Sequence, residues 1–149
     1  MPRLVKGGKW TFGWVEICQD GRLPIPPEAW IEYGFTSNDA FIVIPASRTS
    51  GGFGVTTREH IKASLHIKPL ASLSIVTKGI LKLPETLFEI IEIQVGARLL
   101  TVRGSRYALG CIAKGPIIHE AYNHPELEIF TIESYSRKMI HLSEENEGC

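Results

Sequence analysis

Residues Gly21–Trp30 read GRLPIPPEAW, and this stretch decides how the chain divides into strands and helices. Two adjacent prolines fix two φ angles and remove two backbone donors, so a strand that begins near Gly21 must end by Pro26. Pro27 suits the first turn of a helix, where its missing N–H would lack a partner in any case. The stretch therefore predicts a strand, a sharp stop and a short helix.

The same pattern recurs 58 residues later in the chain. Without a gap, the segment that begins at Gly21 matches the segment that begins at Gly79, and apolar character is kept at further positions such as Trp30 and Phe88. Identical residues fall at Gly21 and Gly79, Leu23 and Leu81, Pro26 and Pro84, Ser47 and Ser105, and Arg48 and Arg106. The agreement of glycine, proline and Ser-Arg in one frame favours an internal duplication over chance.

Each copy predicts the same order of elements: a strand, a glycine turn, a short strand that ends at proline, a short helix, and two further strands. Repeat 1 covers about residues 10–57 and repeat 2 about residues 68–115. The first strands are expected at 10–18 and 70–77, the helices at 27–33 and 85–91, and the third strands at 40–44 and 98–102. Residues 116–149 form an acidic C-terminal extension, with one strand at about 127–132 and a frayed end.

Composition and charge set wider limits on this 149-residue chain. With 44% hydrophobic and 21% charged residues, it reads as an ordinary soluble globular protein. It has neither an apolar run near the roughly 20 residues that span a bilayer nor the apolar core of a secretory signal, so we expect a cytoplasmic protein without a membrane partner. Residues 1–114 hold 14 Lys and Arg against 9 Asp and Glu, whereas residues 115–149 hold 2 against 7. A basic body with an acidic tail occurs in nucleic-acid binders and also in plain soluble proteins.

The segment DGRLPIPPEAWIEYGFTSNDAFIV from Asp20, with its weaker copy KGILKLPETLFEIIEIQVGARLLTV from Lys78, resembles the AbrB/SpoVT/MazE family. Together the two copies cover about residues 10–115. Members of that family form swapped-hairpin β-barrels, and many bind duplex DNA as transcriptional regulators or antitoxin subunits. The resemblance implies a mostly β fold in which residues 1–115 build a pseudo-two-fold swapped-hairpin (cradle-loop) barrel from two copies in one chain. Two such copies can also close edges and bury apolar faces that one copy cannot.

The resemblance implies a regulatory, DNA-binding protein without catalytic activity that forms a homo-oligomer. Arg22 matches the family's turn arginine, and Lys78 and Lys82 flank the second turn, so these three residues are the expected DNA contacts. At the helix positions where the family carries a basic pair, this chain holds Trp30 and Ile31 in the first copy and Phe88 and Glu89 in the second. Neutralisation of phosphates by basic residues supplies much of the affinity for DNA, and these four positions lack a positive charge. The alternative is therefore a module of the same fold that binds a protein partner or a small anionic ligand.

A second candidate site is the repeated Ser-Arg pair, Ser47-Arg48 and Ser105-Arg106, which follows the third strand of each copy beside glycines. Related by a two-fold axis, the two pairs would form an anion cradle, with each arginine supplying a planar fork and the glycines supplying backbone N–H groups. The competing interpretation is that each arginine pairs with a carboxylate such as Glu92 or Asp39 and each serine caps a turn.

The sequence favours no catalytic residue, no metal site and no cofactor. His119 and His124 are spaced so that neither a helix nor a strand places them on one face, and no third ligand is evident. The cysteines and histidines lack a nucleophile context, and the Gly-x-Ser-x-Gly motif of serine hydrolases is absent. Cys18 and Cys111 read as buried small apolar residues, since three cysteines without short spacing do not suggest a disulfide framework.

Overall fold

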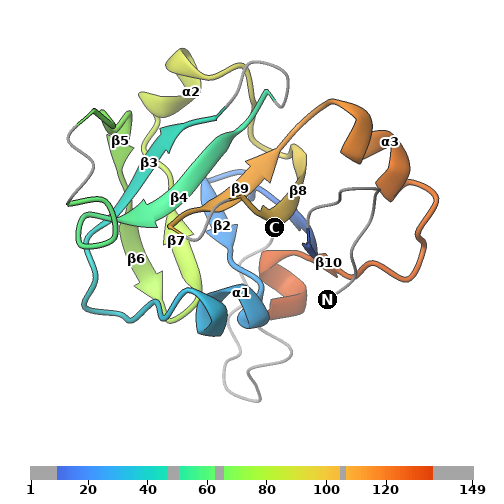
Figure 1. The fold of residues 1–149 in the computed structure, drawn as a ribbon, viewed down its shortest axis with the longest axis horizontal. Coiled ribbons are helices and arrows are strands. Elements are labelled where there is room, and N and C mark those ends of the chain that lie inside the picture. The colour runs from blue at the N-terminus through green and yellow to red at the C-terminus, as the bar shows by residue number, and fades with distance from the viewer. Residues whose placement is uncertain (1–9, 47–50, 63–65, 105–106, 136–149) are drawn as a thin grey trace.

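The computed structural model describes residues 10–46, 51–62, 66–104 and 107–135 of the chain (Figure 1). Its strands are β1 (Thr11–Glu16), β2 (Arg22–Pro24), β3 (Phe41–Pro45), β4 (Phe53–Thr57), β5 (Ala71–Ser72), β6 (Ser74–Thr77), β7 (Ile80–Lys82), β8 (Arg98–Arg103), β9 (Leu109–Ile112) and β10 (Ile129–Phe130). Its helices are α1 (Pro27–Glu32), α2 (Leu87–Ile90) and α3 (Pro116–Ala121), and a further helical turn covers residues 132–135. The predicted β-rich fold with short helices is confirmed.

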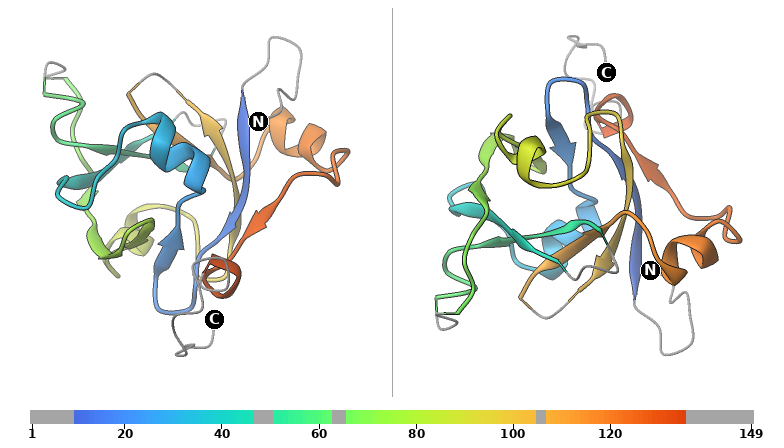
Figure 2. Two further views of the ribbon diagram at one scale, coloured as in Figure 1. Left: turned by 90° about the horizontal axis from the view of Figure 1, so that it is seen from below. Right: turned by 90° about the horizontal axis from the view of Figure 1, so that it is seen from above.

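The described strands form two sheets. A seven-stranded sheet has the order β10-β1-β8-β9-β4-β3-β5, and a three-stranded sheet has the order β2-β7-β6. Every pairing is antiparallel except that of β10 with β1. No closed barrel is found in this part of the chain, because β10 of the C-terminal extension takes the outer edge of β1 and the opposite edge is the two-residue β5 (Figure 2).

The three-stranded sheet joins positions that the sequence comparison matches. Leu23 of β2 lies opposite Leu81 of β7, and the two residues are 58 positions apart. Two backbone hydrogen bonds flank this pair: the Leu83 N–H donates to the Gly21 carbonyl at 2.9 Å, and the Ile25 N–H donates to the Gly79 carbonyl at 2.8 Å. Leu83 matches Ile25 and Gly79 matches Gly21 in the sequence comparison, so the two bonds join equivalent positions. The pairing of β2 with β7 therefore follows the 58-residue offset.

The seven-stranded sheet follows the same offset at two further places. Phe53 of β4 lies opposite Cys111 of β9, again a pair of matched positions. The pairing of β1 with β8 places Trp14 opposite Leu100. The matched positions, Ser72 of β5 and Ile42 of β3, are also partners. The register of strands far apart in the chain thus agrees with the repeat seen in the sequence.

The proline corner behaves as its chemistry predicts. β2 ends at Pro24, and Pro27 occupies the first turn of α1. Leu23, Ile25 and Trp30 around the corner are buried in the main core, which also includes side chains from β1, β3, β4, β7, β8 and β9. Trp30 stacks on Phe41 at 5.5 Å between ring centroids. The corner therefore fastens α1 to the core through large apolar side chains.

Helix α3 was not predicted from the sequence. It follows Gly115, whose φ is +107°, and begins at Pro116. Its buried side chains, Ile118 and Ala121, join a second apolar cluster on β1, β8 and β9 that contains Trp14 and Leu100. The C-terminal extension therefore packs α3 and β10 beside the outer strands of the main sheet (Figure 2). Within the described residues, no helix has the length and apolar character needed to cross a membrane.

Candidate functional site

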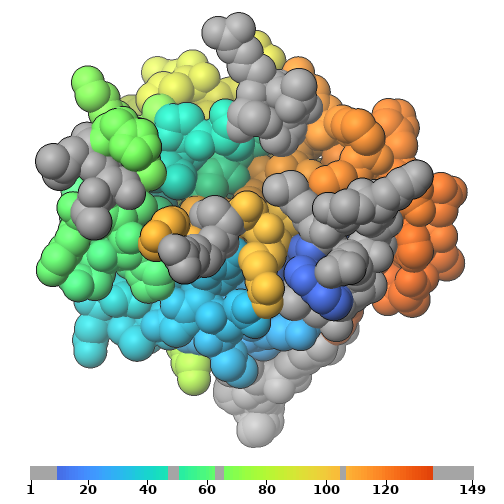
Figure 3. Space-filling model, viewed as in Figure 1, coloured from blue at the N-terminus to red at the C-terminus, as the bar shows by residue number. Residues whose placement is uncertain are grey.

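A hollow of about 470 Å³ lies between α1 and the β6–β7 turn, and we call it the α1 hollow. Its lining includes Trp30, Ile31, Gly34, Phe35, Ser37 and Lys78. In the space-filling view, the yellow-green atoms of the β6–β7 turn emerge beside the blue and cyan segment that contains α1 (Figure 3). The walls are aromatic and the rim carries one lysine, so the α1 hollow offers an apolar surface beside a positive charge.

Ile31 is the most unusual lining residue, because 77% of it is exposed to solvent. The matched position in repeat 2 is Glu89, which is also exposed on the short helix α2. The same place on the fold therefore accepts a charged residue, and helix packing does not require an isoleucine at position 31. Sequence reasoning noted that Ile31 replaces a basic residue of the family pattern but gave no sign of its exposure.

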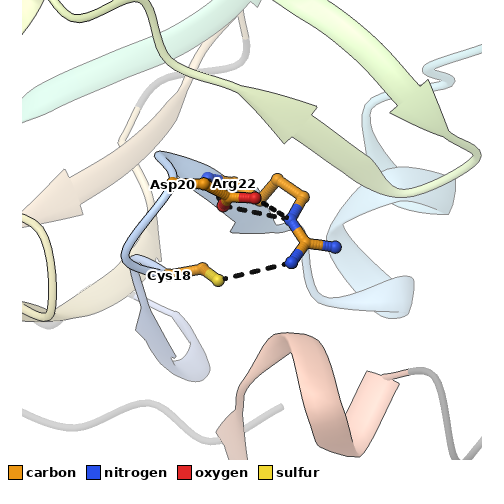
Figure 4. Close-up of polar contacts among 3 residues, drawn as sticks. All are labelled: Cys18, Asp20 and Arg22. Carbon is orange, nitrogen blue, oxygen red and sulfur yellow. Dashed lines mark hydrogen bonds and ion pairs between the residues drawn. The ribbon is translucent and has the colours of Figure 1, made fainter. Parts of the chain in front are cut away.

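The first hairpin turn, 58 residues before Lys78, is chemically different. The Arg22 Nε donates to both carboxylate oxygens of Asp20, at 3.0 and 2.8 Å, and its Nη2 lies 3.6 Å from the Cys18 sulfur (Figure 4). The Arg22 side chain is only 17% exposed. Burial opposes ionisation of Asp20, but the hydrogen bonds from Arg22 and the charges of Arg22 and Lys82 outweigh it and lower the pKa of this carboxyl below its usual 3.8.

The three expected DNA contacts are thus placed in two groups. Arg22 and Lys82 lie directly opposite each other on β2 and β7. Lys78 lies in the β6–β7 turn, at the rim of the α1 hollow. The structure brings Arg22 and Lys82 together, but it also supplies Arg22 with a carboxylate partner. The anion-cradle candidates Ser47, Arg48, Ser105 and Arg106 lie outside the described residues.

Other arginines of the described chain also face carboxylates. Arg98 of β8 pairs with Glu16 of β1 at 2.6 Å. Arg103, at the end of the same strand, pairs with Glu32 of α1. Lys62 pairs with Glu59 at 3.2 Å. These pairs cancel charges that a surface for nucleic acid would need.

Burial disfavours the ionised form of two potential nucleophiles, Cys111 and Tyr33. Burial raises the pKa of the Cys111 thiol to about 12 and that of the Tyr33 hydroxyl to about 12. Tyr33 donates its hydroxyl hydrogen to the Ala108 carbonyl at 2.9 Å, which holds the end of α1 against the β8–β9 connection. Cys18 is buried, as expected from the sequence.

His124 lies between two carboxylates of the extension, with its Nδ1 2.8 Å from Glu126 and its Nε2 3.3 Å from Glu120. The i, i+4 spacing of Glu120 and His124 was a sequence signal for this contact. No group of three or more metal-ligating side chains is found among the residues that the structure describes.

The two carboxylates are expected to keep His124 protonated at pH values above those at which a free histidine loses its proton. The hydrogen bonds that the protonated His124 ring donates to Glu126 and Glu120 raise the pKa of His124, although desolvation acts against them. A raised pKa favours the folded extension below the unfolded pKa of 6.5, and this contribution is lost as pH rises through the folded pKa. An NMR titration should show a His124 pKa above 6.5 that falls in Glu126→Gln; an unchanged pKa in that variant would contradict the contact.

Comparison with known proteins adds no relative. No family model, curated protein or solved structure matches this chain.

Proposed function

We propose that this chain is a non-enzymatic regulatory module of the AbrB-like, swapped-hairpin type, built from two fused copies, and that it binds a protein partner. The fold part of the proposal is supported by strand registers that follow the 58-residue offset, above all Leu23 opposite Leu81 and Phe53 opposite Cys111. A pairing of matched positions is what two interlocked copies require, because a two-fold axis brings a position next to its own equivalent.

The α1 hollow carries the functional part. Ile31 is an exposed apolar side chain at the edge of an aromatic-walled hollow, and the matched residue Glu89 indicates that the fold does not demand it there. Apolar surface rimmed by polar groups is typical of protein-interaction sites. Lys78, Thr36 and Ser37 supply that polar rim. A polypeptide with a bulky apolar side chain fits this surface better than a polyphosphate backbone does.

Duplex DNA is the second candidate, and one observation favours it. Arg22 and Lys82 lie on opposing strands of the β2–β7 ribbon, so two cations from different copies meet at one place. The contact of the Arg22 Nε with both carboxylate oxygens of Asp20 weighs against this candidate, because a phosphate would have to compete with a carboxylate two residues away. Homo-oligomerisation and a small anionic ligand stay predictions.

A photo-crosslinking side chain at Ser37 tests the protein-binding proposal. The exposed Ser37 lines the α1 hollow, so a partner bound there should be captured in cells. Ile31→Glu, which copies Glu89, should reduce capture by roughly tenfold, because it places a charge in an apolar contact. Ile90→Glu is the matched control, since Ile90 is 56% exposed on the other helix, and it should leave capture unchanged. Equal capture by both variants would contradict the proposal.

A labelled duplex separates the two candidates. Fluorescence polarisation at about 50 mM salt, where phosphate contacts are strongest, should detect no binding if the partner is a protein. DNA binding that weakens with salt and is lost in Lys82→Glu would support the second candidate instead.

A further inference from the structure

β6 (Ser74–Thr77) is the outermost strand of the three-stranded sheet, and much of it faces solvent. Val76 is 44% exposed, and the register of β6 against β7 shifts at this residue. Among the described residues, the backbone of Ile75 makes no hydrogen bond outside the β6–β7 pair. A strand edge of this kind can accept another extended segment.

The matched segment in repeat 1, residues 16–19, is covered by other parts of the same chain. The Ile17 N–H donates to the Ala97 carbonyl at 3.0 Å, and the Ile17 carbonyl accepts from the Gly96 N–H at 2.7 Å. Cys18, which matches Val76, is only 5% exposed, and it packs in one cluster with Ile132 and Tyr135 of the extension. The chain therefore fills this position in one copy with its own segments and leaves the equivalent position in the other copy open.

Positive charges surround the open edge. Lys78 follows β6 directly, Lys82 lies opposite Ser74, and Arg58 donates to the Ser72 hydroxyl at 3.3 Å just before the strand. Within the described part of the chain, no carboxylate forms an ion pair with Lys78, and the carboxylate whose pKa the charge of Lys82 lowers, Asp20, already pairs with Arg22. Lys78 also belongs to the α1 hollow, so the edge and the hollow form one continuous surface.

We propose that the β6 edge and the adjoining α1 hollow bind an extended segment of alternating apolar and acidic residues from a protein partner. This inference rests on the proposed function and names the chemistry of its partner. The added strand would pair with the backbone of β6, as in other β-augmentation complexes. Its apolar side chains would cover Val76, and its carboxylates would pair with Lys78 and Lys82.

The chain itself supplies an example of such a segment. Residues 126–130 read ELEIF, and within them β10 pairs with β1. A second copy of the chain fits the open edge less well, because pairing β6 with β6 would bring the lysines at Lys78 and Lys82 of both copies together. Charge complementarity therefore favours an acidic partner strand.

The proposed site begins at Ser74 of β6 and continues along this strand toward the α1 hollow.

A fluorescein-labelled peptide with the sequence ELEIFTIESY, copied from residues 126–135, is the probe. Fluorescence anisotropy should show binding to the full chain that weakens with salt, and the peptide with its three glutamates replaced by glutamine should bind roughly tenfold more weakly. Val76→Asp and Lys78→Glu should each weaken binding by roughly three- to tenfold through like-charge repulsion. Val95→Asp and Lys114→Glu are the matched controls and should bind as the unchanged chain does, since Val95 is 39% exposed and Lys114 lies after β9.

Two results would overturn the inference. One is peptide binding that Val76→Asp and Lys78→Glu leave intact, which would place the peptide elsewhere, including in exchange with the chain's own extension on β1. The other is the absence of binding at every salt concentration. If crosslinking at Ser37 still captures a partner that Ile31→Glu loses, the protein-binding function stands and only the acidic-strand inference fails.

Discussion

Replacing Leu23 or Leu81 with alanine is expected to destabilise the protein by about 2–5 kcal/mol in each case. Both side chains are fully buried in the main core, and they lie opposite each other where β2 pairs with β7. Each substitution removes three carbon atoms from a site that cannot collapse easily, because side chains from several strands pack around it. Chemical denaturation of the two variants should give similar losses, since their surroundings are related by the 58-residue offset.

The double variant sharpens this prediction. Because Leu23 and Leu81 are direct partners, the loss in the double variant should differ from the sum of the single losses by about 0.5–3 kcal/mol. Leu127→Ala is the control, because Leu127 belongs to the separate cluster around Trp14. Leu23→Ala and Leu127→Ala should be additive. Strict additivity between Leu23→Ala and Leu81→Ala would contradict direct packing of these two side chains in one core.

Much of the fold could be predicted because local chemistry marks its corners. Gly21 and Gly79 adopt φ values of +90° and +86° in the two turns, and a residue with a Cβ is disfavoured there. Pro24 and Pro27 fix where β2 ends and α1 begins. These signals act within a few residues, and the expected strands and helices of both copies appear close to their expected places.

The parts that could not be predicted depend on contacts between distant segments. The expected first strand of repeat 2 is divided into β5 and β6, because its upstream part pairs with β3 and its downstream part with β7. The sheet stays open because β10 takes the edge of β1. Gly115 and Pro116 are a sequence signal for the start of α3. The alternating apolar residues further along the extension predicted only a strand.

In the candidate site, too, the residues that carry a local motif could be predicted, whereas their contacts and exposure could not. The turn arginine Arg22 was found from its motif, but its partner Asp20 depends on how the turn folds the chain back over two residues. Trp30, which replaces a basic residue of the family pattern, is buried in the core. The exposure of Ile31 follows from which face of α1 turns toward the core, which a six-residue helix does not reveal in its sequence.

Gly13→Ala is expected to destabilise the protein by about 2–4 kcal/mol. Gly13 has a φ of +131°, which L side chains rarely adopt, and its added Cβ would meet the Glu128 carbonyl oxygen at 2.7 Å and the Phe130 ring at 3.1 Å. The Glu128 carbonyl cannot move away freely, because it accepts the Trp14 N–H at 2.9 Å. Denaturant unfolding gives the stability, and limited proteolysis should show faster cleavage of the extension.

Gly34→Ala separates the two causes of this loss. Gly34 also has a positive φ, +66°, but an added Cβ would have no atom within 4 Å, so only the backbone cost of about 1 kcal/mol is expected. If Gly13→Ala costs no more than Gly34→Ala, β10 does not press on Gly13. A larger loss with faster cleavage would show that the missing Cβ at position 13 is what admits β10.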